Sequence, residues 1–244
     1  MRKFGLLGKN IDYSFSKTYF QHKFKSENIT DASYENFDIE SLEVLPEILS
    51  ENTSLCGFNV TIPYKEAIIP YLDKLSQTAK KIGAVNTVKK TKKGTLIGYN
   101  TDAYGFKKSI EPYLKPHLGQ ALVLGTGGAS KAVLYSLQKL GISYTQVSRS
   151  KKPNTITYAQ LNKTILKTHL LVINTTPLGT FPDTNAFPEI PYHHLTKHHF
   201  LYDLIYNPAE TQFLKKGKTY GCKTLNGKEM LIFQAEKAWR IWNK

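Results

Sequence analysis

The sequence predicts an α/β protein with two domains, the second of which contains a doubly wound parallel sheet. Between residues 121 and 205, short apolar runs alternate with helical and polar stretches. This alternation is typical of parallel strands joined by crossover helices. The 244 residues suffice for one large domain or two small ones. Hydrophobic residues make up 41% of the chain, which is enough for buried cores and excludes a disordered or collagen-like chain.

The first half of the chain combines short strands with helices in an α/β arrangement. Apolar runs predict its strands at 4–7, 55–62 and 94–99, and a helix is expected at 18–27. The polar run Asn100-Thr101-Asp102 has the composition of a helix start, because such side chains cap free backbone N–H groups. We expect the helix that follows to end at Pro112.

The second half supplies the parallel sheet. Its buried strands are predicted at 121–124, 143–148, 170–173 and 200–205. Helical spacing predicts a helix at 130–140 and a final amphipathic helix at 228–242. We expect residues 1–104 and 222–244 to form one domain and 105–221 the other. The C-terminal helix would then return to the first domain.

The chain is strongly basic, with 33 lysines and arginines against 19 acidic residues and a net charge of +14. This balance favours an anionic partner, such as a nucleic acid, a membrane surface or a phosphorylated or carboxylated small molecule. Cys56 and Cys222 are too few for a disulfide framework. No apolar run approaches the ~18 to 20 residues that span a bilayer, and the apolar stretch at 4–7 is too short for a signal peptide. We therefore expect a soluble, cytoplasmic protein.

A glycine-rich turn connects the predicted strand at 121–124 to the helix after it. Strand, glycine turn and helix in this order are typical of dinucleotide binding, because glycines let the backbone approach a pyrophosphate at the helix N-terminus. Ser130 occupies the third glycine position of the usual pattern, and a tight turn without a ligand is the alternative reading. The residues of the turn are Gly125, Thr126, Gly127, Gly128, Ala129 and Ser130.

The end of the next strand indicates which dinucleotide is bound. Sheets that bind NAD usually place an acid there, but Ser148-Arg149-Ser150 and the two lysines that follow include none. Arg149 can pair with a 2′-phosphate in a bidentate manner, and the two serines add hydroxyl donors. The pattern predicts a Rossmann-like domain that binds NADP rather than NAD. The alternative is a solvated basic loop.

Three segments of the first half are dense in polar residues: 13–16, 57–65 and 83–88. Ser14 and Ser16 lie two residues apart, so their hydroxyls face one side of an extended chain. Each polar residue has the alternative of being a satisfied structural group. Together they indicate a pocket for a polyhydroxylated ligand.

These segments and the later motifs resemble shikimate dehydrogenase over nearly the whole chain. The resemblance implies reversible NADPH-dependent reduction of 3-dehydroshikimate to shikimate, in the pathway to chorismate and aromatic amino acids. It implies NADP as cofactor, no nucleic-acid or membrane partner, and a monomer or homodimer. The later motifs lie at 98–106, 125–130, 148–150, 173–179, 202–208 and 226–230.

The resemblance also implies a role for each matching residue. Lys65 and Asp102 would be catalytic, with Lys65 as the acid and Asp102 as its orienting partner. The division of proton transfer between Lys65, Asp102 and water stays open. The implied substrate residues are Ser14, Ser16, Thr61, Asn86, Asp102, Tyr206 and Gln234. The implied cofactor residues are Gly125, Thr126, Gly127, Gly128, Ala129, Ser148, Arg149, Ser150, Thr175, Leu204, Gly227 and Met230. No metal is expected.

Some residues depart from the family pattern. Tyr13 stands where many members have His, and Lys17 where many have Pro. The Lys228-Glu229 pair replaces smaller or apolar residues before Met230. These differences leave the details of a substrate lid open.

Three other functions remain as alternatives. A quinate/shikimate dehydrogenase often accepts NAD and carries an acid where this chain has Arg149. Methylenetetrahydrofolate dehydrogenase has a similar layout, but the serine pair and the Lys65/Asp102 pair favour shikimate. A basic nucleic-acid-binding protein would fit the charge, yet no signature of that class occurs. The histidines at 193–194 and 198–199 lack a metal-ligand pattern, so we expect a surface turn there.

Overall fold

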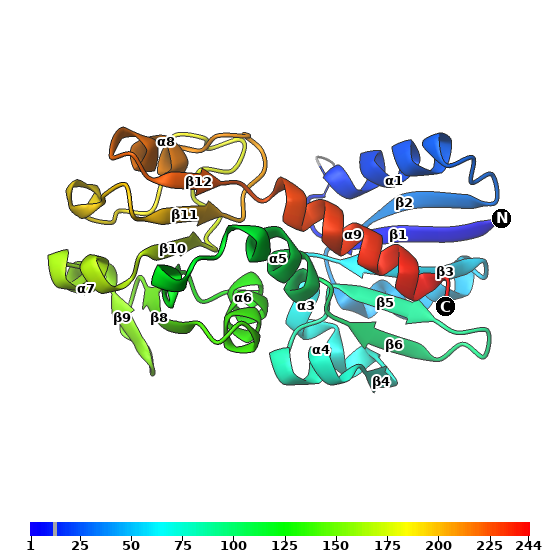
Figure 1. Cartoon of the computed structure of the whole chain (residues 1–244). Helices are drawn as coiled ribbons and strands as arrows, with labels where there is room; N and C mark the ends of the chain where they lie inside the picture. Colours follow the sequence, from blue (N-terminus) through cyan, green and yellow to red (C-terminus); the bar gives the residue numbers. More distant parts are fainter. Residues whose placement is uncertain (12–13) are drawn as a thin grey trace. The chain divides into compact units, whose positions relative to one another are not determined.

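The computed structural model describes residues 1–11 and 14–244, which form two compact units (Figure 1). The first unit contains Met1–Thr101 and Ala235–Lys244, and the second contains Asp102–Gln234. Each unit holds one sheet of six strands within the described residues. The fold class predicted from the sequence is confirmed, including the return of the C-terminal residues to the first unit.

The first sheet is mixed and has the strand order β2-β1-β3-β5-β6-β4. Strand β1 runs parallel to β2 and β3, whereas β5 runs antiparallel to both β3 and β6. Its strands are β1 (Arg2–Gly8), β2 (Ala32–Asp38), β3 (Leu55–Val60), β4 (Lys74–Leu75), β5 (Thr87–Lys90) and β6 (Leu96–Tyr99). The helices of this part are α1 (Phe15–Ser26), α2 (Leu45–Glu51), α3 (Tyr64–Ala67) and α4 (Gln77–Ile82).

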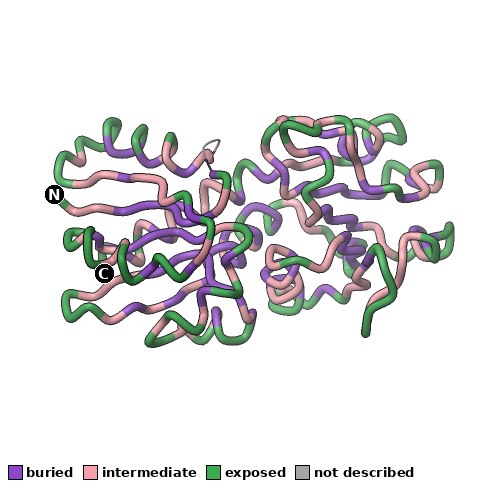
Figure 2. The backbone as a smooth tube through the Cα atoms, turned by 180° about the vertical axis from the view of Figure 1, so that it is seen from behind, coloured by how far each residue is buried: buried purple, intermediate pink, exposed green. Residues whose placement is uncertain are grey.

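Helices cover both faces of the first sheet, and its adjacent strands β1 and β3 are mostly buried (Figure 2). On one face, α1 and the second half of α9 (Lys228–Trp242) enclose an aromatic cluster. Phe4 stacks on Trp242 at 4.9 Å between ring centroids, and Phe20 stacks on Tyr34 at 4.5 Å. On the other face, α2, α3 and α4 bury aliphatic residues such as Leu45 and Ile68. Aromatic packing therefore ties α1 and α9 to the sheet.

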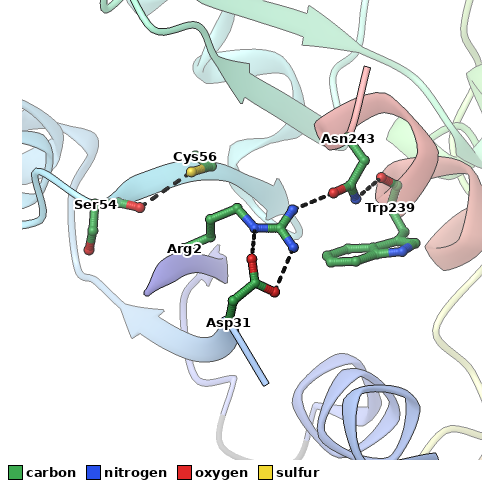
Figure 3. A network of polar contacts seen from close by, with 6 residues as sticks. All are labelled: Arg2, Asp31, Ser54, Cys56, Trp239 and Asn243. Atoms are coloured by element: carbon green, nitrogen blue, oxygen red, sulfur yellow. Dashed lines mark hydrogen bonds and ion pairs between the residues drawn. The ribbon is translucent and has the colours of Figure 1, made fainter. Parts of the chain in front are cut away.

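Arg2 links the start of β1 to the end of α9 (Figure 3). Its guanidinium donates to both carboxylate oxygens of Asp31, at 2.8 and 2.9 Å, and to the side-chain oxygen of Asn243. Asn243 in turn donates to the Trp239 carbonyl oxygen at 2.7 Å. The guanidinium carbon also lies 5.5 Å from the centroid of the Trp239 ring. This network is exposed, so it contributes less stability than the aromatic cluster beneath it.

The second sheet is entirely parallel and has the order β12-β11-β10-β7-β8-β9. The chain order reverses between β7 and β10, the arrangement that defines a doubly wound sheet. Its strands are β7 (Gln120–Leu124), β8 (Ser143–Ser148), β9 (Thr155–Thr157), β10 (Leu171–Asn174), β11 (Phe200–Asp203) and β12 (Lys223–Leu225). The helices of this unit are α5 (Asp102–Ile110), α6 (Gly128–Lys139), α7 (Lys163–Thr168), α8 (Gln212–Thr219) and the first half of α9.

The limits of the two units differ from the domain limits expected from the sequence, 104/105 and 221/222. In the structure, the boundaries between the two units lie at Thr101/Asp102 and at Gln234/Ala235. The second limit moves because Lys223–Leu225 pairs with β11 as an edge strand. Met230 is also buried in the core of the second unit, together with Phe106 and Tyr202. Helix α9 therefore contributes residues to both units.

Most predicted elements occur where the sequence placed them. The strand at 143–148 and the helix at 228–242 have the predicted limits. The expected strand at 200–205 ends two residues early, because the Asp203 side chain accepts the Ile205 N–H at 3.1 Å and turns the backbone. Among the described residues, no helix has the length and apolar character needed to span a membrane.

Candidate active site

Polar residues of the first unit gather at one edge of its sheet. Strand β3 ends where β5 begins, since Asn59 pairs with Thr87, and β6 ends there too, since Thr87 pairs with Tyr99. The parallel pairing of Leu6 with Asn59 places the end of β1 at the same edge. The residues that follow or precede these strand ends are Ser14, Ser16, Thr61, Asn86 and Thr101. The sheet thus brings together residues far apart in sequence.

Ser14 and Ser16 lie at the N-terminus of α1. Ser14 is the N-cap, and its hydroxyl oxygen accepts the Ser16 N–H at 3.3 Å. The first turn of this helix contains no acid, so its N–H groups and partial positive charge favour an anion such as a carboxylate. Tyr13, the departure from the family pattern noted above, lies outside the described residues.

Asn86 is buried within a network of hydroxyl and amide groups. Its side-chain amide donates to the Thr101 hydroxyl at 3.0 Å, and its side-chain oxygen accepts the Thr101 N–H at 2.6 Å. The Thr87 hydroxyl donates to the same oxygen at 3.2 Å. These bonds fix the amide in one orientation, which is what a site that distinguishes hydroxyl groups requires.

A second layer supports this network from within the core. Tyr34 donates to the Asn59 side-chain oxygen at 2.8 Å, and Asn59 donates to the Asn86 carbonyl oxygen at 3.2 Å. Burial raises the pKa of Tyr34. A chain of hydrogen bonds therefore joins Tyr34 through Asn59 to the backbone of Asn86. Asn59 lies in one of the polar segments from which a ligand pocket is predicted, whereas Tyr34 had no predicted role.

Lys65 and Thr61 follow β3. Lys65 lies in the single turn of α3, and its carbonyl oxygen accepts the Val85 N–H at 2.7 Å, next to Asn86. Thr61 is held by its own N–H, which donates to the Leu7 carbonyl oxygen at 2.9 Å. Asp102 is buried and is the first residue of α5. Lys65 belongs to the first unit, whereas Asp102 begins the second.

The glycine turn of the second unit lies at the point where the strand order reverses. Gly125 has φ +110°, and a Cβ there would lie 2.8 Å from the Thr175 hydroxyl oxygen. Thr175 closes the turn from β10, since its N–H and hydroxyl donate to the Leu124 carbonyl oxygen at 2.9 and 2.6 Å. Gly127 is the N-cap of α6 and provides no side-chain cap, and the first turn of α6 holds no acid. These features fit the pyrophosphate of a dinucleotide.

Ser130 explains why the third glycine of the usual pattern is dispensable here. Its buried hydroxyl donates to the Gly127 carbonyl oxygen at 2.6 Å. Gln146 of β8 donates to the Gly125 carbonyl oxygen at 2.8 Å and to the Ser130 hydroxyl at 3.2 Å. Side-chain hydrogen bonds thus hold this turn together where the pattern would have relied on a close helix–strand contact.

The end of β8 presents a cationic surface. Ser148 is buried, whereas Arg149 and Ser150 are exposed. Lys152 donates to the Thr126 hydroxyl at 3.0 Å and so connects the basic loop to the glycine turn. The Tyr158 hydroxyl lies near Arg149, and burial raises the pKa of Tyr158 to about 12. The arrangement fits a phosphorylated ribose better than a ribose hydroxyl.

A third group of predicted residues meets where β11 and α9 approach each other. A Cβ on Gly227 would lie 2.0 Å from the Leu204 carbonyl oxygen, so only glycine allows this contact. Gly105 of α5 approaches α9 just as closely. A Cβ on Gly105 would lie 2.5 Å from the Met230 carbonyl oxygen and 3.0 Å from Gln234 Cβ. Asp102 precedes Gly105 by one helical turn and shares its face of α5. Tyr206 follows Leu204 by two residues and is partly buried.

The sequence analysis assigned no role to Asp203 or Asn174, which support this region. Asp203 is fully buried and accepts hydrogen bonds from the Asn174 amide at 3.0 Å, the Ile205 N–H at 3.1 Å and the Thr211 hydroxyl at 2.6 Å. Burial raises the pKa of Asp203 to about 6, although these bonds oppose the shift. A buried acid at the end of a parallel strand was the signal that could have identified it.

The histidines near residue 196 have structural surroundings. His193 and His194 lie in a short 3₁₀ turn. His199 is buried; its Nδ1 accepts the Thr196 N–H at 3.0 Å, and its Nε2 lies 3.0 Å from the Leu166 carbonyl oxygen. Burial lowers the pKa of His199. In the parts of the chain that the structure describes, no cluster of three or more His, Cys, Asp or Glu residues could hold a metal.

The doubly wound sheet, the glycine turn and the basic strand end define a dinucleotide-dependent oxidoreductase with two domains. The family follows from comparison with known proteins. Residues 6–88 match the family model described as "Shikimate dehydrogenase substrate binding domain". The chain is 41% identical to an NADP(+) shikimate dehydrogenase of Methanococcus maripaludis and 36% identical to one of Caldicellulosiruptor bescii. These alignments cover 98 and 99% of this chain and 90 and 89% of the relatives. The chain belongs to the shikimate dehydrogenase family.

Solved structures agree with this assignment. The structure of shikimate 5-dehydrogenase from Thermus thermophilus, in complex with NADP(H) and shikimate, has a TM-score of 0.87 and 33% identity, over 99% of this chain and 93% of that one. A quinate dehydrogenase of Corynebacterium glutamicum, in complex with NAD, has a TM-score of 0.86 and 27% identity, over 99% and 93%. The expectation of an NADP-linked enzyme of the shikimate dehydrogenase family is confirmed.

Proposed function

We propose that this chain catalyses the reversible NADPH-dependent reduction of 3-dehydroshikimate to shikimate, as a step toward chorismate and the aromatic amino acids. The observation that carries the proposal is the buried Asn86 amide, which Thr87 and Thr101 hold in one orientation at the edge of the first sheet. This amide is suited to ring hydroxyls, and the N-terminus of α1, which Ser14 caps, is suited to a carboxylate. Shikimate combines these two groups.

The residue roles are those that the family resemblance implies, and the arrangement supports them. Ser14 and Ser16 bind the substrate carboxylate, because they lie at the N-terminus of α1. Thr61 and Asn86 bind the ring hydroxyls, and Asp102, Tyr206 and Gln234 complete the substrate contacts. Ser14, Ser16, Thr61 and Asn86 belong to the first unit, whereas Asp102, Tyr206, Gln234 and the NADP residues belong to the second.

The cofactor residues divide into three groups. The glycine turn and Thr175 hold the pyrophosphate, and the residues at 148–150 bind the 2′-phosphate. The Leu204–Gly227 contact and Met230 line the nicotinamide side. NADPH supplies the hydride that reaches the carbonyl carbon C3 of the substrate.

Lys65 stabilises the negative charge that develops at the carbonyl oxygen and protonates this oxygen. As hydride arrives, the C3–oxygen double bond becomes a single bond and the oxygen gains negative charge. The Lys65 ammonium stabilises that charge and donates the proton that completes the new hydroxyl group. In oxidation, neutral Lys65 takes the same proton. Asp102 orients the reacting hydroxyl and Lys65.

An absorbance assay at the reduced-nicotinamide band tests this function. Shikimate and quinate are each supplied with NADP and with NAD. Rapid reduction with shikimate and NADP alone supports the proposal. Preference for quinate or NAD would assign the chain to the quinate branch, and no turnover in any combination would contradict the proposed reaction. Two further expectations, a cytoplasmic location and a monomeric or homodimeric state, are tested by cell fractionation and light scattering.

A further inference from the structure

Asp203 is a carboxylic acid in the core of the second unit, away from solvent. Its side chain has no exposed surface. Burying such a group is costly unless its oxygens are fully hydrogen-bonded. Three donors from three different segments satisfy it: Asn174 at the end of β10, Ile205 just after β11, and Thr211 at the start of α8. The carboxylate is therefore the meeting point of these segments.

Two of those segments carry residues assigned to the cofactor. Because Asn174 gives its amide to Asp203, its side-chain oxygen faces the other way and accepts the Thr176 N–H at 3.0 Å and the Thr176 hydroxyl at 2.6 Å. Thr175, the preceding residue, closes the glycine turn. Asp203 thus determines the orientation of Asn174 and, through it, the path of the backbone at 175–176.

The second segment is held from two sides. Asp203 accepts the Ile205 N–H, and the Ile205 carbonyl oxygen accepts the Gly227 N–H at 3.0 Å. Leu204 is bonded in the same region, since its N–H donates to the Asn174 carbonyl oxygen at 3.0 Å. Its own carbonyl oxygen is packed against Gly227. The backbone at 204–205 therefore has little freedom as long as the carboxylate stays in place.

We propose that Asp203 is a positioning residue that holds two backbone segments of the NADP site, 175–176 next to the glycine turn and 204–205 at the nicotinamide end. This inference rests on the proposed function and deepens it. The 2′-phosphate end at Ser148–Ser150 lies at the carboxyl end of β8, and none of these three hydrogen bonds of Asp203 reaches that strand. Loss of the carboxylate should therefore weaken the nicotinamide end and spare the adenosine end.

Binding measurements separate the two ends. The full-length protein is titrated with NADP and with adenosine 2′,5′-bisphosphate, which lacks the nicotinamide half. Asp203→Ala removes the acceptor from two backbone-anchoring groups, so we expect NADP to bind about tenfold more weakly. The affinity for the bisphosphate should stay within about twofold of the wild type. Equal weakening of both ligands, or of neither, would overturn the proposal.

Two matched variants distinguish positioning from general stability. Asp203→Asn keeps one oxygen for Asn174 and Ile205 and can donate to the Thr211 oxygen, so it should restore NADP binding to within about threefold of the wild type. Thr211→Val removes one bond to the same carboxylate and also the cap of α8. It should lower the melting temperature but leave NADP affinity within about threefold. NADP binding that is lost equally in Thr211→Val would identify Asp203 as a purely structural residue.

A further variant applies if Asp203→Ala does not fold. Asn174→Ala leaves Asp203 bonded to Ile205 and Thr211 but frees Thr176. It should show the same split between NADP and the bisphosphate. These readouts do not depend on turnover. A wild-type protein that binds NADP but does not oxidise shikimate would therefore contradict the proposed reaction and leave the role of Asp203 testable.

Discussion

The two candidate ligand sites of this chain are built from different material. At the edge of the first sheet, the site is formed by buried side chains: Tyr34 donates to Asn59, and the Thr87 hydroxyl accepts from Asn59 and donates to Asn86. At the edge of the second sheet, the site is formed by backbone geometry, at Gly125 and at the start of α6, which has no side-chain cap. A side-chain site discriminates among ligands by hydroxyl pattern, whereas a backbone site accepts any pyrophosphate that fits. Substitutions should therefore affect the two sites in different ways.

The largest expected effect is on the chemistry at the first site. Lys65→Ala removes the proton donor and should lower kcat by about a thousandfold, because general acid catalysis contributes on the order of 10² to 10⁴. Shikimate affinity should remain within about threefold, since the serines and Asn86 still bind the ligand. Steady-state kinetics and a shikimate titration measure both quantities. Lys80→Ala, an exposed lysine of α4, is the control. Turnover near that of the control would exclude Lys65 as the acid.

Next in size is the pH dependence of the acid beneath the second site. The pKa of Asp203 is about 6 in the folded chain and 3.8 in its ordinary state, so the folded chain binds more protons between these values. The Asp203 contribution to the unfolding free energy therefore falls as the pH rises from about 4 to 7, by about 3 kcal/mol. Urea unfolding of the wild type and Asp203→Asn at pH 4 and pH 7 tests this. The variant should gain stability relative to the wild type at pH 7, and an unchanged difference at both pH values would contradict the prediction.

Alanine substitutions at two glycines of the second site should have different effects, one on stability and the other on NADP binding. Gly125→Ala forces a side chain into a left-handed backbone and against Thr175, so it should cost about 2 kcal/mol of unfolding free energy without any ligand. A Cβ on Gly127 meets nothing within 4 Å. Gly127→Ala should therefore change stability by less than about 0.5 kcal/mol, yet weaken NADP binding by filling the space of the pyrophosphate. Thermal unfolding and NADP titration of both variants test this difference. Equal stabilities of the two variants would contradict the prediction.

The smallest effect concerns the inner layer of the first site. Tyr34→Phe leaves the Asn59 oxygen without its buried donor and should cost about 1 to 2 kcal/mol. The same change at Tyr144, whose hydroxyl accepts an exposed hydrogen bond from Gln138, should cost less than about 0.5 kcal/mol. Urea unfolding of the pair measures the difference. A Tyr34 variant as stable as the Tyr144 variant would show that the inner layer contributes little.

The sequence predicted the second unit better than the first. Its buried parallel strands read as continuous apolar runs, and the glycine turn marked where a strand gives way to a helix. Strand β2 has the opposite character: Ser33, Glu35 and Asn36 make it look like a loop, and only pairing with β1 reveals it as a strand. Asp203 was equally hidden, because a lone polar residue acquires its role from partners that are distant in sequence. The resemblance to a family supplied the site residues that the patterns alone did not.

The shared helix α9 has a consequence for the order in which the chain folds during synthesis. Trp242 stacks on Phe4 and donates to the Val88 carbonyl oxygen at 2.9 Å, so residues made late complete a core begun by residues made first. Until they emerge from the ribosome, the apolar face formed by Phe4, Phe20 and Tyr34 has no cover. The second unit, by contrast, has almost its whole sequence available earlier. The first unit therefore keeps an exposed apolar surface until synthesis is nearly finished, whereas the second unit can fold earlier. Such a surface favours binding of the first unit by a chaperone.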